Sequence, residues 1–141
     1  MTKSSRFVVA VHVLALLAYG EGEAMTSDYL AGSINTNPVV VRRILALLAR
    51  AGLVVTQEGA KGGVRLAQPA EGIDLGAVYA AVESGALFAL HPQPPNPACP
   101  VGGVIQAALE PTLDAASAAL QASLAKTTVA DVVRRLREEC S

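Results

Sequence analysis

Three arginines in one stretch of the chain are the first residues whose spacing suggests a chemistry. Arg42, Arg43 and Arg50 lie in residues 38–50, where apolar residues recur at helical spacing. One face of the predicted helix carries Val41, Ile44, Leu45 and Leu48, and the opposite face carries Val39, Arg42, Arg43, Ala46 and Arg50. A guanidinium group can donate two hydrogen bonds to guanine O6 and N7 or bind a phosphate, and an exposed valine can contact a thymine methyl group. The pattern predicts a helix that reads double-stranded DNA, while a solvated arginine face on an ordinary amphipathic helix fits the same residues.

The residues before this helix are suited to begin it and to meet an anion. Asn37 is a good N-cap, and Pro38 fits the first helical position because the N–H that it lacks would have no partner there. Thr36 and Asn37 therefore stand at a helix N-terminus, where side chains and N–H groups can bind a DNA phosphate.

Two β-rich segments follow, at residues 53–56 and 64–67, with Gly59, Gly62 and Gly63 between them. The pattern predicts a hairpin with a flexible tip. Lys61 at that tip and Arg65 on the returning strand fit a wing that reaches along the DNA backbone or into the minor groove. The alternative is a turn that needs glycine for backbone reasons only.

The elements around the arginine helix define the expected fold. We predict a first helix from Ser4 or Ser5 to Tyr19, which buries Phe7, Val11, Leu14 and Ala18, with Leu17 beside them. A second helix is expected from Thr26 or Ser27 to Ile34, and a fourth begins after Asp74. Helix, short helix, turn, helix and hairpin is the order of a winged helix-turn-helix. The expected fold class is therefore mostly α with a small β-hairpin wing, followed by a long C-terminal dimerisation helix.

The rest of the chain predicts a loop and two more helices. Residues 84–100 hold five prolines and are expected to be a loop. A long helix is predicted from about Val101, with a heptad-like seam of Leu109, Leu113, Ala116 and Leu120 and a bend or break at Pro111. Because that seam would leave an apolar stripe on a monomer, we expect a homodimer that binds an inverted-repeat DNA site. Thr127 or Thr128 then caps a last helix.

Cys99 lies just before the predicted long helix, whose positive end would favour a thiolate. This indicates a redox or electrophile sensor, and the alternative is an inert structural cysteine. A thiol-dependent enzyme would need His91 as the base for Cys99, but no oxyanion-hole motif and no orienting Asp or Asn is evident nearby. We therefore expect no enzyme and no bound metal or cofactor, and we regard Cys140 as incidental.

Composition and charge narrow the class of protein further. The 141 residues are 52% hydrophobic and 16% charged, which predicts a folded chain. Residues 1–66 hold seven basic and four acidic side chains, and residues 67–141 hold four and eight, so an anionic partner is expected at the front half. The apolar run 7–18 resembles a signal peptide but also serves as a core helix, and it is too short to span a bilayer. Two cysteines make no disulfide scaffold, so we expect a cytoplasmic protein without a membrane partner.

At this point the chain resembles a known family. Residues 36–45 (TNPVVVRRIL), 51–54 (AGLV), 59–66 (GAKGGVRL), 73–75 (IDL) and 78–83 (VYAAVE) are similar to the Rrf-type bacterial winged-helix regulators, whose members include iron–sulfur, nitric-oxide and cysteine-metabolism regulators. The resemblance implies a homodimer paired through the long helix after the wing. Cluster-binding members carry three cysteines in the loop before that helix, whereas this chain has Cys99 alone and resembles the cluster-free branch with N-P-x-C-P-V-G. Cluster-type members often have an arginine before the first wing glycine, whereas this chain has Glu58 there. The resemblance therefore implies that Lys61 or Arg65 would be the side chain that enters the minor groove.

The expected organisation is a DNA-binding domain at 1–83, a sensor loop at 84–100 and dimerisation helices at 101–141. The expected function is that of a homodimeric, sequence-specific repressor of transcription that responds to an oxidant or a small molecule through Cys99. The remaining alternative is a helical dimer that binds protein and not DNA. Steep weakening of binding by salt would distinguish DNA from a protein partner.

Overall fold

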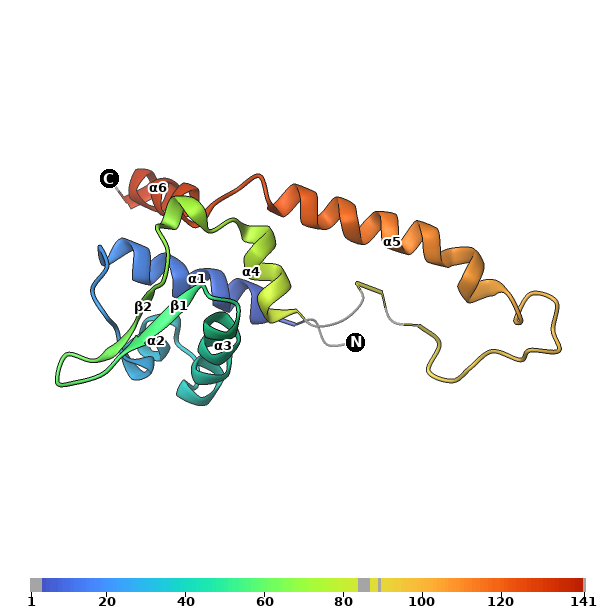
Figure 1. Ribbon diagram of the computed structural model, residues 1–141, viewed down its shortest axis with the longest axis horizontal. Helices are drawn as coiled ribbons and strands as arrows, with labels where there is room; N and C mark the ends of the chain where they lie inside the picture. The colour runs from blue at the N-terminus through green and yellow to red at the C-terminus, as the bar shows by residue number, and fades with distance from the viewer. Residues whose placement is uncertain (1–3, 84–86, 89, 141) are drawn as a thin grey trace.

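The computed structural model describes residues 4–83, 87–88 and 90–140. It is mostly helical, with one two-stranded antiparallel hairpin and a long helix that extends away from the rest of the molecule (Figure 1). The elements in chain order are α1 (Arg6–Tyr19), α2 (Ser27–Ile34), α3 (Pro38–Arg50), β1 (Val54–Gln57), β2 (Gly63–Leu66), the 3-10 turn η1 (Ala70–Gly72), α4 (Leu75–Val82), α5 (Ile105–Leu124) and α6 (Val129–Cys140). This order confirms the predicted fold class.

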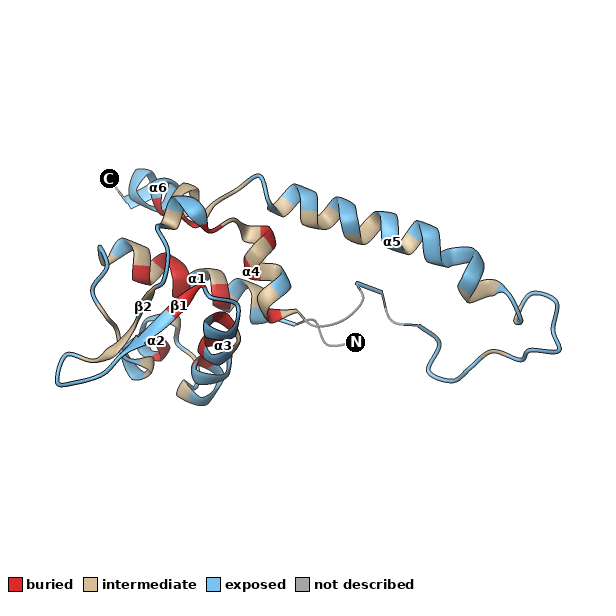
Figure 2. Ribbon diagram, viewed as in Figure 1, coloured by how far each residue is buried: buried red, intermediate tan, exposed pale blue. Residues whose placement is uncertain are grey.

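The core lies where α1, α2, α3 and α4 meet, and Figure 2 shows the buried residues gathered there. The predicted buried face of α3 is confirmed, since Val41, Ile44, Leu45 and Leu48 are all buried. The face predicted for α1 was partly wrong. Its buried residues are Ala10, Val13, Leu14, Ala15 and Leu17, whereas Phe7, Val11 and Ala18 are only partly buried. The reason is that several helices pack around α1 and cover a wider stripe than one seam.

Side-chain caps begin α2, α3 and α4 as predicted, whereas Ser5, the N-cap residue of α1, makes no side-chain cap hydrogen bond. Thr26 accepts a hydrogen bond from the backbone N–H of Tyr29 (3.1 Å), and Asn37 accepts one from that of Val39 (2.8 Å). Asp74 does the same for Ala77 at 2.9 Å. Gly52 ends α3 with φ +78, a conformation that suits glycine. These caps fix where each helix starts and therefore which side chains α3 exposes.

The last helix returns to the DNA-binding half and packs on α1. A reciprocal capping box begins it: Thr128 N–H donates to Asp131 (2.9 Å), and Asp131 N–H donates to the Thr128 hydroxyl (3.0 Å). Val129 and Val133 are buried in the common core. The helix α6 thus completes the core of the winged helix.

The long helix α5 differs from the expectation in two ways. It begins at Ile105 and not near Val101, because residues 98–104 form turns. Pro111 lies inside a continuous helix, so of the predicted bend or break the break was wrong. The proline costs one backbone hydrogen bond near the N-terminal end, where the following turns still hold the helix. None of the 20 residues of α5 is buried. Its C-terminal end packs against α4, whereas near its N-terminal end Gln106 lies within hydrogen-bond distance of His91 (3.3 Å) in the preceding segment.

Candidate nucleic-acid interface

The exposed face of α3 carries the side chains that the sequence singled out. Arg42, Arg43 and Arg50 are exposed, and Val39 is 43% exposed. Asn37 is exposed and caps the helix, and Thr36 beside it is half-buried. Because the opposite face of α3 is buried in the core, the three guanidinium groups face solvent.

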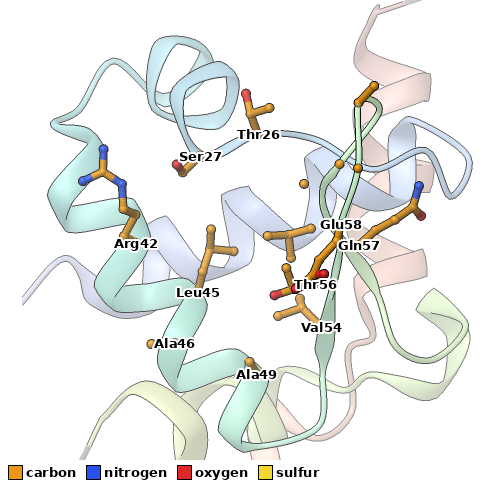
Figure 3. Close-up of a pocket in the computed structure, with 15 residues that line it drawn as sticks. Thr26, Ser27, Arg42, Leu45, Ala46, Ala49, Val54, Thr56, Gln57 and Glu58 are labelled. Atoms are coloured by element: carbon orange, nitrogen blue, oxygen red, sulfur yellow. The ribbon is translucent and has the colours of Figure 1, made fainter.

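A groove of about 720 Å³ separates α3 from the hairpin (Figure 3). Arg42, Leu45, Ala46 and Ala49 line its helix side, while Thr56, Gln57 and Glu58 line its hairpin side. Small alanines on the helix leave the groove open, which permits close approach of a backbone. Thr26 and Ser27, at the N-terminus of α2, close one end. The hydroxyls of Thr26 and Ser27 join Thr56 and Gln57 as polar groups that line the groove. Sequence reasoning missed this set because its members come together only through the packing of α2, α3 and the hairpin.

The hairpin is held in place by the segment before α2. Val64 donates to the carbonyl oxygen of Met25 at 2.8 Å, and Met25 donates to that of Val64 at 2.9 Å. Gly63 has φ +147, and a side chain there would collide with the backbone of Met25, so glycine is required. This pairing sets the angle between the wing and α2.

The two basic residues of the wing lie in different places. Lys61 is exposed at the tip, where its carbonyl oxygen accepts a hydrogen bond from Gln57 Nε2 (3.4 Å). Arg65 pairs with Val55 across the ladder, whereas Thr56 in the groove pairs with Val64. Since successive strand residues point to opposite faces, Arg65 lies on the face of the hairpin away from the groove. Glu58 lies on the groove side and is acidic, so Lys61 is the basic side chain of the hairpin tip.

Most of these cations are not neutralised within the molecule. Across residues 4–83, 87–88 and 90–140, Arg42 forms one long ion pair with Asp28 (3.9 Å), and no ion pair involves Arg43, Arg50, Lys61 or Arg65. Several cations on α3 and the wing, most of them without an ion pair among the described residues, are the arrangement expected of a surface that binds polyanions.

Comparison with known proteins supports the same interpretation. The Rrf2 family model, described as an iron-dependent transcriptional regulator, matches residues 3–135. The chain belongs to the Rrf2 family.

Individual members agree with this assignment. YwnA of Bacillus subtilis (strain 168), named as an HTH-type transcriptional regulator, is 41% identical over 134 residues, which cover 94% of this chain and 98% of YwnA. A crystal structure described as that of a DNA-binding protein is 37% identical, covers 91% of this chain and 98% of its own, and has a TM-score of 0.74. CymR, the global cysteine regulator of B. subtilis, shares the fold at 20% identity with a TM-score of 0.69, over 96% of this chain and 98% of that one.

This Rrf2-family protein is therefore a DNA-binding transcriptional regulator. The family and these relatives are regulators and not enzymes, which confirms that the chain is no thiol-dependent enzyme. The alternative of a helical module that does not bind DNA is set aside on the same ground. Within the described part of the chain, no helix is both long and apolar enough to cross a membrane.

The residues present do not fit the iron that the family description implies. An iron–sulfur cluster usually takes four protein ligands, mostly thiolates. Cys99 is the one cysteine between α4 and α5, and Cys140 borders a separate groove between α1 and α6. Among the described residues, no three His, Cys, Asp or Glu side chains are grouped so that they could hold a metal ion. The described residues of this family member therefore do not supply the ligands for an iron–sulfur cluster.

Cys99 is exposed in the turn that precedes α5. Backbone N–H groups of Gly102 and then of Val101 donate to its sulfur and lower the pKa of the Cys99 thiol below its usual value. The lowered pKa agrees with the expectation, but the cause differs. A turn, and not the first turn of α5, supplies the N–H groups, because α5 begins only at Ile105.

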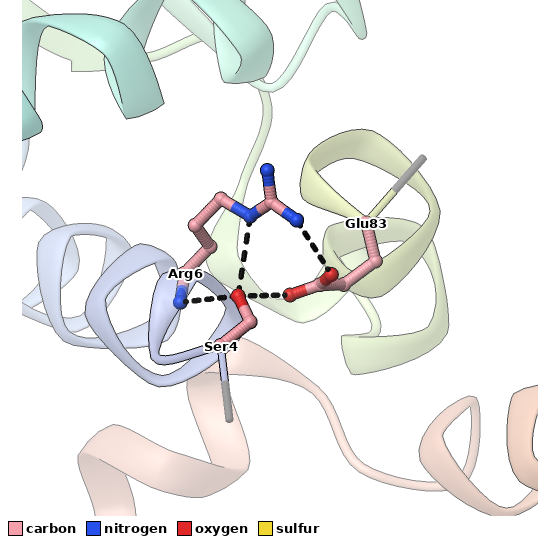
Figure 4. Close-up of polar contacts among 3 residues, drawn as sticks. All are labelled: Ser4, Arg6 and Glu83. Carbon is pink, nitrogen blue, oxygen red and sulfur yellow. Dashed lines mark hydrogen bonds and ion pairs between the residues drawn. The ribbon is translucent and has the colours of Figure 1, made fainter. Parts of the chain in front are cut away.

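The root of the segment that carries Cys99 is tied to α1 (Figure 4). Glu83, at the end of α4, accepts hydrogen bonds from the Ser4 hydroxyl (3.0 Å) and from Arg6 Nη2 (3.2 Å). The Arg6 guanidinium also donates to Ser4 at 3.2 Å through Nε. This three-residue cluster fixes the point at which the chain leaves the DNA-binding half. Residues 84–86 and 89, which belong to the predicted sensor loop, lie outside the described residues.

Proposed function

We propose that this protein reads a specific double-stranded DNA sequence with α3 and holds the DNA backbone with its wing. The observation that carries the proposal is the exposed arginine face of α3 beside the open groove. Arg42 and Arg43 would donate to guanine edges, Arg50 to a phosphate, and Val39 would contact a thymine methyl group. Thr36 and Asn37 would meet a phosphate at the N-terminus of α3, and Lys61 and Arg65 would contact the backbone on either side of the wing. We place this function in the cytoplasm, where the chromosome of a bacterium lies.

Selection of bound fragments from random DNA would give the site, and substitutions would assign the roles. Arg43→Ala should cost about 1–3 kcal/mol on the selected site and relax one base position. Arg135→Ala, an exposed arginine of α6 on the other side of the molecule, is the matched control and should leave binding unchanged. If Arg42→Ala and Arg43→Ala both bind like the parent with unchanged base preference, the assignment of α3 as the reading helix is wrong.

We propose that the regulator is a homodimer paired through α5. What supports this is a 20-residue helix with no buried residue, on which Leu109 is 44% exposed and Leu113 and Leu120 are half-buried. A monomer rarely leaves such an apolar stripe in water. A two-fold dimer requires a two-fold operator whose half-sites lie about one helical turn, or a multiple of it, apart. A dimer mass by light scattering at micromolar concentration, and a monomer mass for Leu113→Asp with unchanged helical content, are expected. A monomer mass for the parent would refute the proposal.

We further propose repression that is tuned by oxidation of Cys99. A thiolate can attack one oxygen of a peroxide and break the O–O bond, which leaves a sulfenic acid on Cys99. The hydroxide or alkoxide that leaves takes a proton from solvent to give water or an alcohol. The new oxygen would compete for the Gly102 and Val101 N–H groups and so disturb the turn before α5. Since both DNA-binding halves must match half-sites on one duplex, a change in the dimer arm should lower affinity with every DNA contact intact.

The test compares Cys99→Ser with the parent, each titrated onto operator DNA with and without mild peroxide. Cys140→Ser is the matched control, because it removes the other exposed thiol. Oxidant should weaken binding by the parent and by Cys140→Ser but not by Cys99→Ser. If the parent does not respond, or if Cys99→Ser responds equally, Cys99 is a structural residue. Transcription from an operator-bearing template in vitro, which should fall as protein is added, tests repression itself.

A further inference from the structure

Asp28 stands next to the arginine that the groove exposes. It lies in the first turn of α2, and its Oδ1 is 3.9 Å from Nη2 of Arg42. Both side chains are open to solvent, with 79% of the Asp28 side chain and 57% of the Arg42 side chain exposed. Because this pair is the one ion pair of the α3 arginines in residues 4–83, 87–88 and 90–140, Arg42 differs from Arg43 and Arg50 in having a carboxylate within ion-pair distance.

The carboxylate of Asp28 is not needed to cap its own helix. Thr26 already accepts the hydrogen bond from the Tyr29 N–H at the start of α2. The positive end of α2 nevertheless favours an anion there, and the carboxylate remains available to Arg42. An acid at this place weakens the attraction of the surface for phosphates, and that cost suggests a gain elsewhere.

We propose that Asp28 is a positioning residue for Arg42 and thereby a determinant of sequence specificity. A guanidinium has five N–H donors in a rigid fork. One edge directed at Asp28 leaves another edge for O6 and N7 of a guanine, with fewer rotamers to lose when DNA binds. The same carboxylate repels the phosphates of DNA that does not bring a guanine to Arg42. Asp28 therefore lowers the affinity for wrong sequences and sharpens the reading of the right one.

This inference rests on the proposed reading of a base by Arg42, and the experiment separates the two. Dissociation constants are measured for the selected operator, for the operator with the guanine at the Arg42 position replaced, and for unrelated duplex DNA. The proteins are the parent, Asp28→Asn, Arg42→Ala and the double variant. Glu71→Gln is the matched control, since it removes one exposed negative charge from η1, on the α6 side of the molecule.

The expected result is a loss of discrimination and not of affinity. A surface ion pair shifts an equilibrium by about 1.5- to 5-fold, so Asp28→Asn should lower the discrimination ratio by about 2- to 25-fold when two half-sites contribute. Binding to unrelated DNA should tighten in Asp28→Asn and stay unchanged in Glu71→Gln. In the Arg42→Ala background, Asp28→Asn should no longer change discrimination, and Asp28→Glu should restore part of it.

Two results would overturn the inference in different ways. If Arg42→Ala keeps full discrimination, Arg42 reads no base, and both the proposed role of Arg42 and this inference are wrong. If Arg42→Ala loses discrimination while Asp28→Asn keeps it, or loses it equally with and without Arg42, only the role of Asp28 is wrong. Thermal melts of each variant establish that α2 is folded in every comparison.

Discussion

Replacement of Lys61 by alanine isolates the contribution of the wing to DNA binding. The Lys61 side chain is exposed at the hairpin tip, while its backbone is held by the hydrogen bond from Gln57 and by the turn between Gly59 and Gly62. The substitution therefore removes a charge without changing the hairpin. Because a tip that touches only phosphates reads no bases, we expect Lys61→Ala to weaken binding to all sequences by the same factor.

The size of the effect follows from counterion release. Each phosphate contact contributes about 0.9 to the slope of log K against log salt, so one lost contact per half-site lowers the slope of a homodimer by about 1.8. Between 50 and 200 mM salt, a parent therefore loses about 12-fold more affinity than Lys61→Ala does. The difference is about 3.5-fold if only one wing touches DNA.

The assay is a titration of labelled operator and of unrelated duplex at several salt concentrations. Lys126→Ala is the matched control, because Lys126 is exposed just after α5 and is not among the residues that line the groove. Equal salt slopes for Lys61→Ala and the parent would refute wing contact by this residue. A loss confined to the operator would show that Lys61 reads bases, against the reasoning above.

Four further outcomes are expected. Asn37→Ala should lower the free energy of unfolding by about 1 kcal/mol in urea melts, because α3 loses its cap; an unchanged midpoint would contradict this. Glu83→Gln should cost up to about 1 kcal/mol, since the carboxylate pairs with a half-exposed Arg6, and Arg6→Ala should add little to it. The lowered pKa means that Cys99 is thiolate at a lower pH than an unstructured cysteine, so the midpoint of its alkylation rate, measured in Cys140→Ser, should lie below that of a cysteine peptide. Anaerobic purification with added iron should give colourless protein, and brown protein with stoichiometric iron and sulfide would contradict the analysis of the ligand set.

The DNA-binding half could be predicted from local sequence features, namely helix caps, apolar periodicity and turn glycines. Asn37-Pro38 and Gly52 mark the two ends of α3, because capping chemistry is encoded within a few residues. The alternation of apolar and basic residues indicates which face of the helix is buried. The hairpin was placed to within one residue for the same reason, since its glycines mark the tip.

Features that depend on packing were not accessible in this way. Thr26 and Gln57 are 31 residues apart and meet at the groove only because Met25 pairs with Val64. Asp28 and Arg42 belong to different helices, and no periodicity within either helix links them. The stripe on α1 was misjudged because helices from both halves of the chain cover it. The start of α5 was misjudged because residues 100–104, which precede it, form turns and not a first helical turn.

The position of the Cys99 segment restricts how a signal can reach DNA. In Figure 1 the segment before α5 lies at the end of that helix farthest from the wing and α3. A change at Cys99 cannot touch a DNA contact of its own chain directly. It can act along α5, whose other end packs on α4, or across a dimer that uses the exposed face of α5. In either case the quantity that changes is the placement of two DNA-binding halves. Linkage then requires that operator DNA shift the oxidation equilibrium of the Cys99 thiol by the same factor by which oxidation alters DNA affinity. Sensing and dimerisation are for this reason a single hypothesis in this protein, and a Leu113→Asp monomer should bind a single half-site with an affinity that oxidation of Cys99 leaves unchanged.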